Sequence, residues 1–168
     1  ASAEGEGGEG EGEGAARTQD PASDDVEYLY RLGMVRGHLA AFIELYRAGS
    51  YDMAATHVKH PESELYTALA PAFAARGEPG FADALSSLAD AAANQDNVEQ
   101  VYAATIAAIR ASAVEGGPKT TLLAVSQLVA TAAEEFDIGV ADGGVIVEPH
   151  EYQDAFGFLS AAREMVAE

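Results

Sequence analysis

The sequence predicts an all-α fold, a bundle of six or seven helices that follows a disordered acidic tether. Apolar residues recur three and four positions apart through most of the chain after residue 22, the spacing of one helical face. Glycine and proline divide this pattern into helix-sized segments. Among 168 residues 48% are hydrophobic, many of them alanine, which favours closely packed helices in one domain. We therefore expect a tether over residues 1–22 and a bundle domain over residues 23–168.

The expected tether alternates glycine with glutamate and ends near Pro21. It contains no large apolar side chain, so it cannot bury enough surface to offset the entropy of ordering. Segments of this composition often follow the leader or lipid-anchor site of exported bacterial proteins. Because the chain begins at Ala1 and not at methionine, we expect that a leader or a tag has been removed.

The first helix is predicted from Asp24 to Ala48. Asp24 and Glu27 have the spacing of a capping box, and Gly49 is a typical helix stop. The helix is apolar on most sides, which predicts a position in the middle of the bundle.

Two glycines four residues apart, Gly33 and Gly37, form a stripe of small residues on this helix. Such a stripe allows the backbone of another helix to approach closely.

The remaining elements follow from the same signals. Asp96 and Glu99 are expected to form a second capping box. The predicted helices cover Tyr51–Lys59, Pro61–Arg76, 81–92, 98–113, Lys119–Phe136 and a last helix from Pro149, with an extended piece at Val145–Val147. In the last two helices the residues expected to face the core are Leu122, Val125, Leu128, Val129, Ala132, Tyr152, Ala155, Phe156, Leu159, Ala162 and Val166.

Charge and composition exclude several classes of function. The net charge is -19 and there are only two lysines, so neither nucleic acid nor an anionic membrane surface is an expected partner. Without cysteine there is no disulfide and no thiolate ligand. The longest apolar run, residues 122–133, is too short and too polar for a transmembrane segment. No catalytic motif is present, and we expect that the protein is not an enzyme.

The candidate metal ligands are His38, His57, His60 and Glu64. Three of the four histidines lie within 23 residues. His38 precedes the turn after Ala48 by about ten residues and His57 follows it by about eight, so an antiparallel helix pair would bring them level. Neutral imidazole suits iron, copper, zinc or haem.

A purely structural interpretation of the same histidines stays open. His38 would then be a buried neutral side chain, His57 a surface residue at a helix C-terminus, and His60 the residue before Pro61.

Three charged groups in the C-terminal part of the chain are further candidates. His150, Glu151 and Asp154 open the last helix, where acidic residues suit the helix dipole, and this explanation is preferred for them. Glu134, Glu135 and Asp137 end the preceding helix, where negative charge is unfavourable. A third group, Arg163, Glu164 and Glu168, misses the RExxE motif of iron permeases by one residue.

The segment EEFDIGVADGGVIVEPHEYQDAFGFLSAARE, residues 134–164, resembles periplasmic helical regions of bacterial iron-permease-type proteins. An acidic and aromatic helix end, a glycine turn and an EYxxAxxF helix carry the resemblance. The whole chain resembles small exported alphaproteobacterial helical proteins of unassigned function, through its GHL helix followed by HP and ELY. The resemblance to iron-permease-type proteins implies metal handling in the cell envelope, and it assigns no ligand.

We therefore predict an exported domain of the periplasm or extracellular space, soluble or lipid-anchored through its tether. It is expected to bind a transition metal, iron or copper, or a haem-type tetrapyrrole. The alternative is a non-catalytic structural or interaction module of an envelope protein complex, using the face with Gly33 and Gly37 and the acidic tether.

Overall fold

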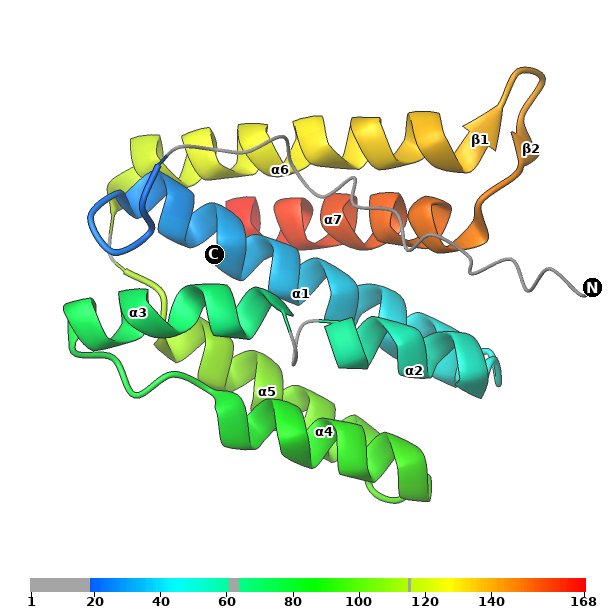
Figure 1. Ribbon diagram of the computed structural model, residues 1–168, viewed down its shortest axis with the longest axis horizontal. Helices are drawn as coiled ribbons and strands as arrows, with labels where there is room; N and C mark the ends of the chain where they lie inside the picture. Colours follow the sequence, from blue (N-terminus) through cyan, green and yellow to red (C-terminus); the bar gives the residue numbers. More distant parts are fainter. Residues whose placement is uncertain (1–18, 61–63, 115) are drawn as a thin grey trace, which may run out of the picture.

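The computed structural model describes residues 19–60, 64–114 and 116–168, and its architecture is all-α (Figure 1). The predicted fold class is confirmed. Most of the predicted tether lies outside the described residues. The elements in chain order are α1 (Asp25–Arg47), α2 (Tyr51–His60), α3 (Tyr66–Arg76), α4 (Ala82–Asn94), α5 (Val98–Ala111), α6 (Gly117–Gly139), β1 (Val140–Ala141), β2 (Val145–Ile146) and α7 (Pro149–Ala167).

Helix α1 lies in the centre of the bundle, as its apolar pattern predicts. Sixteen of its 23 residues are buried. Its N-terminus is capped by Asp24, whose carboxylate accepts a hydrogen bond of 2.8 Å from the backbone N–H of Glu27. The Glu27 carboxylate is buried and pairs with Arg31 at 2.7 Å. The predicted cap by Asp24 is thus present. The side chain of Glu27 forms an ion pair with Arg31, one turn further along α1.

Helix α7 packs so closely on α1 that only glycine fits at two contact points. A Cβ atom on Gly37 would overlap the ring of Phe158, and one on Gly157 would overlap the carbonyl oxygen of Gly37. Gly33 faces Leu128 of α6 and Met165 of α7. The close approach predicted for this stripe is confirmed. The helices that approach belong to the same chain, so this face of α1 is covered within the domain.

The α1–α2 connection folds α2 back beside α1 (Figure 1). Gly49 has φ 79°, a left-handed conformation that favours glycine. The backbone N–H of Ser50 donates to the carbonyl of Leu45 at 2.9 Å, which closes the end of α1. Helix α2 continues through His60, one residue beyond the predicted end.

The inward faces predicted for α6 and α7 are wrong in part. Leu128, Ala132, Ala155 and Ala162 are buried, but six of the large apolar side chains expected in the core are exposed. The exposed set is Leu122, Val129, Tyr152, Phe156, Leu159 and Val166. Gly157 lets α7 approach α1 closely, beside the buried Phe158 and Met165, and the other large side chains of α7 face outward.

Two local predictions need correction or extension. Asp96 does not cap α5; the cap residue is Asn97, with φ 52° and no side-chain cap bond. The side-chain amide of Asn97 instead donates to Asp96 at 3.0 Å. The predicted extended piece is strand β2, which pairs with β1 in an antiparallel hairpin between α6 and α7.

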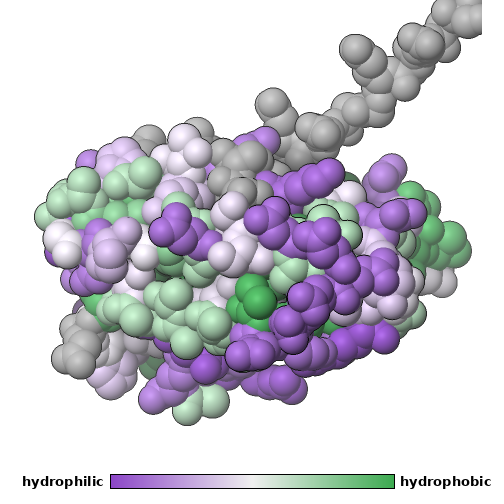
Figure 2. Space-filling view, turned by 90° about the horizontal axis from the view of Figure 1, so that it is seen from below, coloured by the Kyte–Doolittle hydropathy of each residue, from purple (hydrophilic) through white to green (hydrophobic). Residues whose placement is uncertain are grey.

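The surface on the side of α4 and α5 carries many hydrophilic side chains between weakly hydrophobic ones (Figure 2). This distribution fits the high acidic content and the alanine-rich helices. In the described part of the chain, no helix has both the length and the apolar character needed to cross a membrane.

Candidate metal centre

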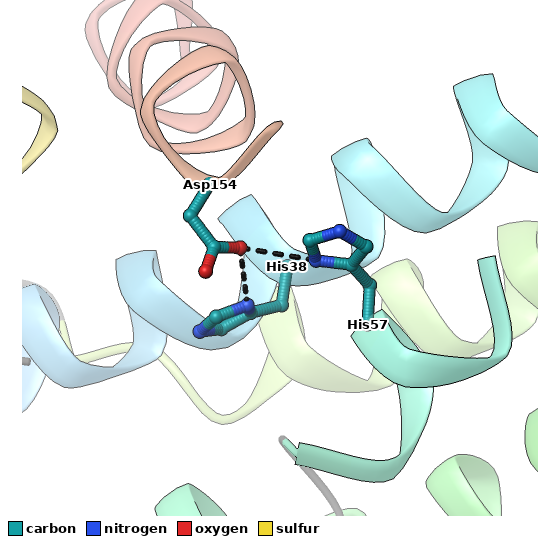
Figure 3. Close-up of side chains that lie close together, drawn as sticks. All are labelled: His38, His57 and Asp154. Carbon is teal, nitrogen blue, oxygen red and sulfur yellow. Dashed lines mark ion pairs between the residues drawn. The ribbon is translucent and has the colours of Figure 1, made fainter. Parts of the chain in front are cut away.

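Three buried side chains from three helices meet in the interior: His38 of α1, His57 of α2 and Asp154 of α7 (Figure 3). Oδ1 of Asp154 lies 2.8 Å from Nδ1 of His38 and 3.0 Å from Nδ1 of His57. Both imidazoles are fully buried and Asp154 is 2% exposed. One ligand atom from each residue lies within 4.8 Å of the others. We call these three residues the inner triad.

The packing around the triad orients both rings. The ring of His38 lies edge-on to Phe158, with centroids 5.1 Å apart. Nε2 of His57 lies 2.8 Å from Oε1 of Gln153, an atom that only accepts hydrogen bonds, so Nε2 carries the proton. The amide of Gln153 in turn contacts Sδ of Met53 at 3.8 Å. In the neutral ring, Nδ1 of His57 is therefore unprotonated, and its lone pair is directed toward Asp154.

This tautomer makes the contact between His57 and Asp154 unusual. Nδ1 of His57 and Oδ1 of Asp154 are 3.0 Å apart, yet neither has a hydrogen-bond partner with suitable geometry. Two lone pairs at this distance repel unless a cation lies between them. Metal–ligand bonds of about 2.0–2.2 Å at right angles place neighbouring ligand atoms about 2.8–3.1 Å apart. The observed separations of 2.8 and 3.0 Å match that geometry.

The carboxyl group of Asp154 is held in its ionised form. Burial by itself would raise its pKa, but the neighbouring His38 is the main influence in the opposite direction, and that pKa lies well below its usual range. An ionised carboxylate with two imidazoles supplies one oxygen and two nitrogen ligands. This 2-His-1-carboxylate donor set is typical of non-haem ferrous sites.

A second group of possible ligands lies on the solvent side of Asp154, where α7 begins. Nδ1 of His150 is 3.3 Å from Oδ2 of Asp154, and Glu151 completes the group. The rings of His57 and His150 are stacked, with centroids 4.3 Å apart and planes 3° from parallel. Burial lowers the pKa of His150 below its ordinary value, and the Asp154 carboxylate opposes that shift only in part.

The structure brings together two of the four ligands predicted from sequence. His38 and His57 lie with ring centroids 6.1 Å apart, so the turn after Ala48 does bring them level. The side chain of His60 lies outside the described residues. Glu64 is exposed and, among the described residues, is not part of either ligand group. Metal binding by these four residues stays a prediction.

In the sequence, Asp154 is explained by the helix dipole, and it is therefore not among the predicted ligands. Its helical spacing is a signal for it, but a second face of α7 is spaced as regularly. The buried face of α7 contains Asp154, Gly157, Phe158, Ala161 and Met165, which recur three and four residues apart. Asp154 shares the face that packs on α1, and a carboxylate there requires a buried partner. The acidic group at the end of α6 is divided: Glu135 is buried, while Glu134 and Asp137 are exposed.

Residues 112–168 match the model of the iron permease-associated 4-helix bundle domain. The match includes α6, the β hairpin and α7, and so Asp154 and its neighbours, but not His38 or His57. It supports the iron-permease-type resemblance of the C-terminal segment. Neither the curated proteins nor the solved structures contain a match to the chain. The molecule is thus an all-helical bundle with a buried 2-His-1-carboxylate group, and its C-terminal region is similar to the iron permease-associated 4-helix bundle domain.

Proposed function

We propose that this domain binds ferrous iron as cargo in the cell envelope, through His38, His57 and Asp154. The contact that carries the proposal is the one between Nδ1 of His57 and Oδ1 of Asp154, which lacks hydrogen-bond geometry at 3.0 Å. A cation bound to both atoms removes the repulsion. The match of residues 112–168 to an iron permease-associated domain favours iron among the metals that this donor set accepts. The proposed role is binding and delivery, without catalysis.

The size of the site favours an ion over a tetrapyrrole. The ligand atoms of the inner triad lie within 4.8 Å of one another, and the Phe158 ring packs against His38. That spacing suits a single ion, whereas a haem plane needs its axial ligands on opposite faces. Cu²⁺ is expected to bind this nitrogen and oxygen set more tightly than Fe²⁺ in vitro, following the general order of divalent metals. Selection for iron therefore depends on which metal is supplied.

The interaction module is the weaker account because its expected docking face is occupied. Gly33 and Gly37 contact Leu128, Phe158 and Met165 of the same chain. A partner could reach that stripe only by displacing α7. An assembly with other envelope proteins through another surface remains compatible with metal binding.

The test is anaerobic Fe²⁺ binding measured by equilibrium dialysis with elemental analysis. The parent is expected to bind one tight equivalent. His57→Ala and Asp154→Asn are each expected to weaken binding at least about 100-fold, the upper end of losses seen for even indirect metal contacts. Asp142→Asn is the matched control, since it removes the same charge from the exposed hairpin turn.

Two results would contradict the proposal. The first is a parent protein that binds neither Fe²⁺ nor Cu²⁺ at micromolar concentration. The second is a set of variants, Asp154→Asn included, that bind as the parent does. In either case the inner triad is a structural cluster, in which a protonated imidazole pairs with Asp154.

A further inference from the structure

We propose that His150 and Glu151, together with Oδ2 of Asp154, form a second cation position, which we call the outer position. Metal ions reach the inner triad through it. This inference rests on the proposed function, because it assigns the route to the same buried site. It adds two residues and a transient binding step to that function.

Burial is the first observation in its favour. His38 and His57 are fully buried and Asp154 is 2% exposed, so the inner triad has no direct contact with solvent. The side chain of His150 is 43% exposed and touches Asp154 at the same time. Glu151 is also partly exposed. A hydrated ion can therefore meet His150 and Glu151 before it meets any member of the triad.

The two oxygens of Asp154 face different partners. Oδ1 contacts Nδ1 of both triad histidines, and Oδ2 contacts Nδ1 of His150. The carboxylate thus belongs to both positions, and an ion bound to Oδ2 stays bound to Asp154 while it moves to Oδ1. The ring of His150 is stacked on that of His57 with centroids 4.3 Å apart, so the histidine of the second position lies next to a histidine of the triad.

The outer position is suited to brief occupancy. It lies in the first turn of α7, where the helix dipole disfavours a cation. Two divalent ions sharing one carboxylate would also repel each other strongly. An ion at the outer position is therefore expected to move inward or leave, while the negative charge of Glu151 and of the whole chain, -19, attracts the next one.

The experiment measures Co²⁺ association by stopped-flow absorption, together with the equilibrium Kd. His150→Phe retains an aromatic ring that can stack on His57 but removes the ligand nitrogen. His150→Ala removes both the nitrogen and the ring. If His150 is a ligand on the route, both variants slow association by about tenfold or more, within the range that local fields and ligands give to association rates. The Kd of the inner triad should change less than about threefold, because the outer position lowers the barrier in both directions.

Glu151→Gln tests the carboxylate independently of the imidazole, with Glu148→Gln as the matched control. Both substitutions remove one negative charge near the start of α7, and Glu148 is exposed and outside the ligand group. Association should slow with Glu151→Gln clearly more than with Glu148→Gln. Equal slowing by the two substitutions would mean that Glu151 acts only through the overall electrostatic field of the protein. That result would overturn its assignment as a ligand.

The outcomes separate the two proposals. Faster association with His150→Ala but not with His150→Phe would show that the ring of His150 only blocks access to the inner triad. The outer position would then be rejected. Unchanged rates in both His150 variants would reject it as well, while tight Co²⁺ binding that needs His57 and Asp154 would leave the proposed function standing. A parent that binds no Co²⁺, Fe²⁺ or Cu²⁺ would reject both.

Discussion

Two clusters of charged side chains join α1 to the C-terminal helix, and they start only two residues apart on α1. Arg36 is buried and pairs with Glu168 at 2.7 Å and Glu164 at 3.1 Å. His38 is buried and pairs with Asp154 at 2.8 Å. In the first cluster a guanidinium always carries protons toward carboxylate oxygens, so attraction needs nothing else. In the second cluster the imidazole nitrogens can also present lone pairs.

The difference distinguishes an ion pair that holds helices together from a group of atoms arranged as ligands. Glu164 and Glu168 are about two-fifths exposed, and Arg110 adds a further contact to Glu168 at 2.7 Å. The Arg36 cluster is thus partly exposed; Nη1 and Nη2 of Arg36 donate to the two carboxylates, while its buried Nε has no hydrogen-bond partner. The inner triad is almost fully buried, and its contact between His57 and Asp154 lacks hydrogen-bond geometry. The triad is the functional candidate because it is buried and because its imidazole nitrogens can present lone pairs. Charge alone does not distinguish it from the Arg36 cluster.

The largest expected effect is stabilisation by metal. A ligand at 100 times its Kd adds about 2.7 kcal/mol to the free energy of unfolding. We expect thermal unfolding of the parent to shift upward with Fe²⁺ or Zn²⁺, measured by calorimetry under anaerobic conditions. His38→Ala should lose that shift, whereas Arg36→Met should retain it. An equal shift in both variants would mean that the inner triad is no more responsible for metal binding than the Arg36 cluster.

Gly37→Leu should affect both clusters, because Gly37 lies between Arg36 and His38 and touches Phe158 of α7. Overpacking is expected to cost about 1–3 kcal/mol in chemical denaturation. Metal binding should weaken too, since Asp154 moves with α7. Ala103→Leu, at an exposed position in the middle of α5, is the control and should be close to neutral. A stable Gly37→Leu variant would contradict the close packing of α1 and α7.

Arg36→Met should destabilise the domain moderately, by about 1–2 kcal/mol in urea unfolding, through lost hydrogen bonds to charged groups. The loss stays moderate because Glu164 and Glu168 are partly exposed and regain water. Metal affinity should remain within a factor of about two, as expected for sites without shared ligands. A large loss of metal affinity would show that the two clusters are coupled through α1.

Glu168→Gln should have the smallest effect, under about 1 kcal/mol, as is usual for partly exposed ion pairs. Burial alone would raise the pKa of Glu168, but its contacts with Arg36 and Arg110 lower it below its ordinary value. The contribution to stability is therefore present above the unfolded pKa, about 4.3, and is lost as pH falls through the folded value. The difference in Tm between parent and variant should narrow below about pH 4. A difference that is constant from pH 7 to pH 3 would rule out this charge effect.

Local signals in the sequence determined the helices and their ends. Asp24 caps α1, Gly49 ends it, and the proline before His150 opens α7, because capping, left-handed φ and the missing proline N–H act within one turn. The approach of His38 to His57 also followed from the sequence, since the two histidines lie at similar distances before and after the turn that joins α1 to α2.

Only the tertiary structure decided which faces of α6 and α7 point inward, and so brought Asp154 to the histidines. Helical periodicity defines a face by spacing, but Tyr152, Leu159 and Val166 share a spacing as regular as that of Asp154, Ala161 and Met165. The choice depends on how near α7 can approach α1. Gly37 and Gly157 allow backbone contact, which favours the face with small residues and leaves the larger side chains exposed. Asp154 lies 116 positions after His38, and no local rule links residues at that separation.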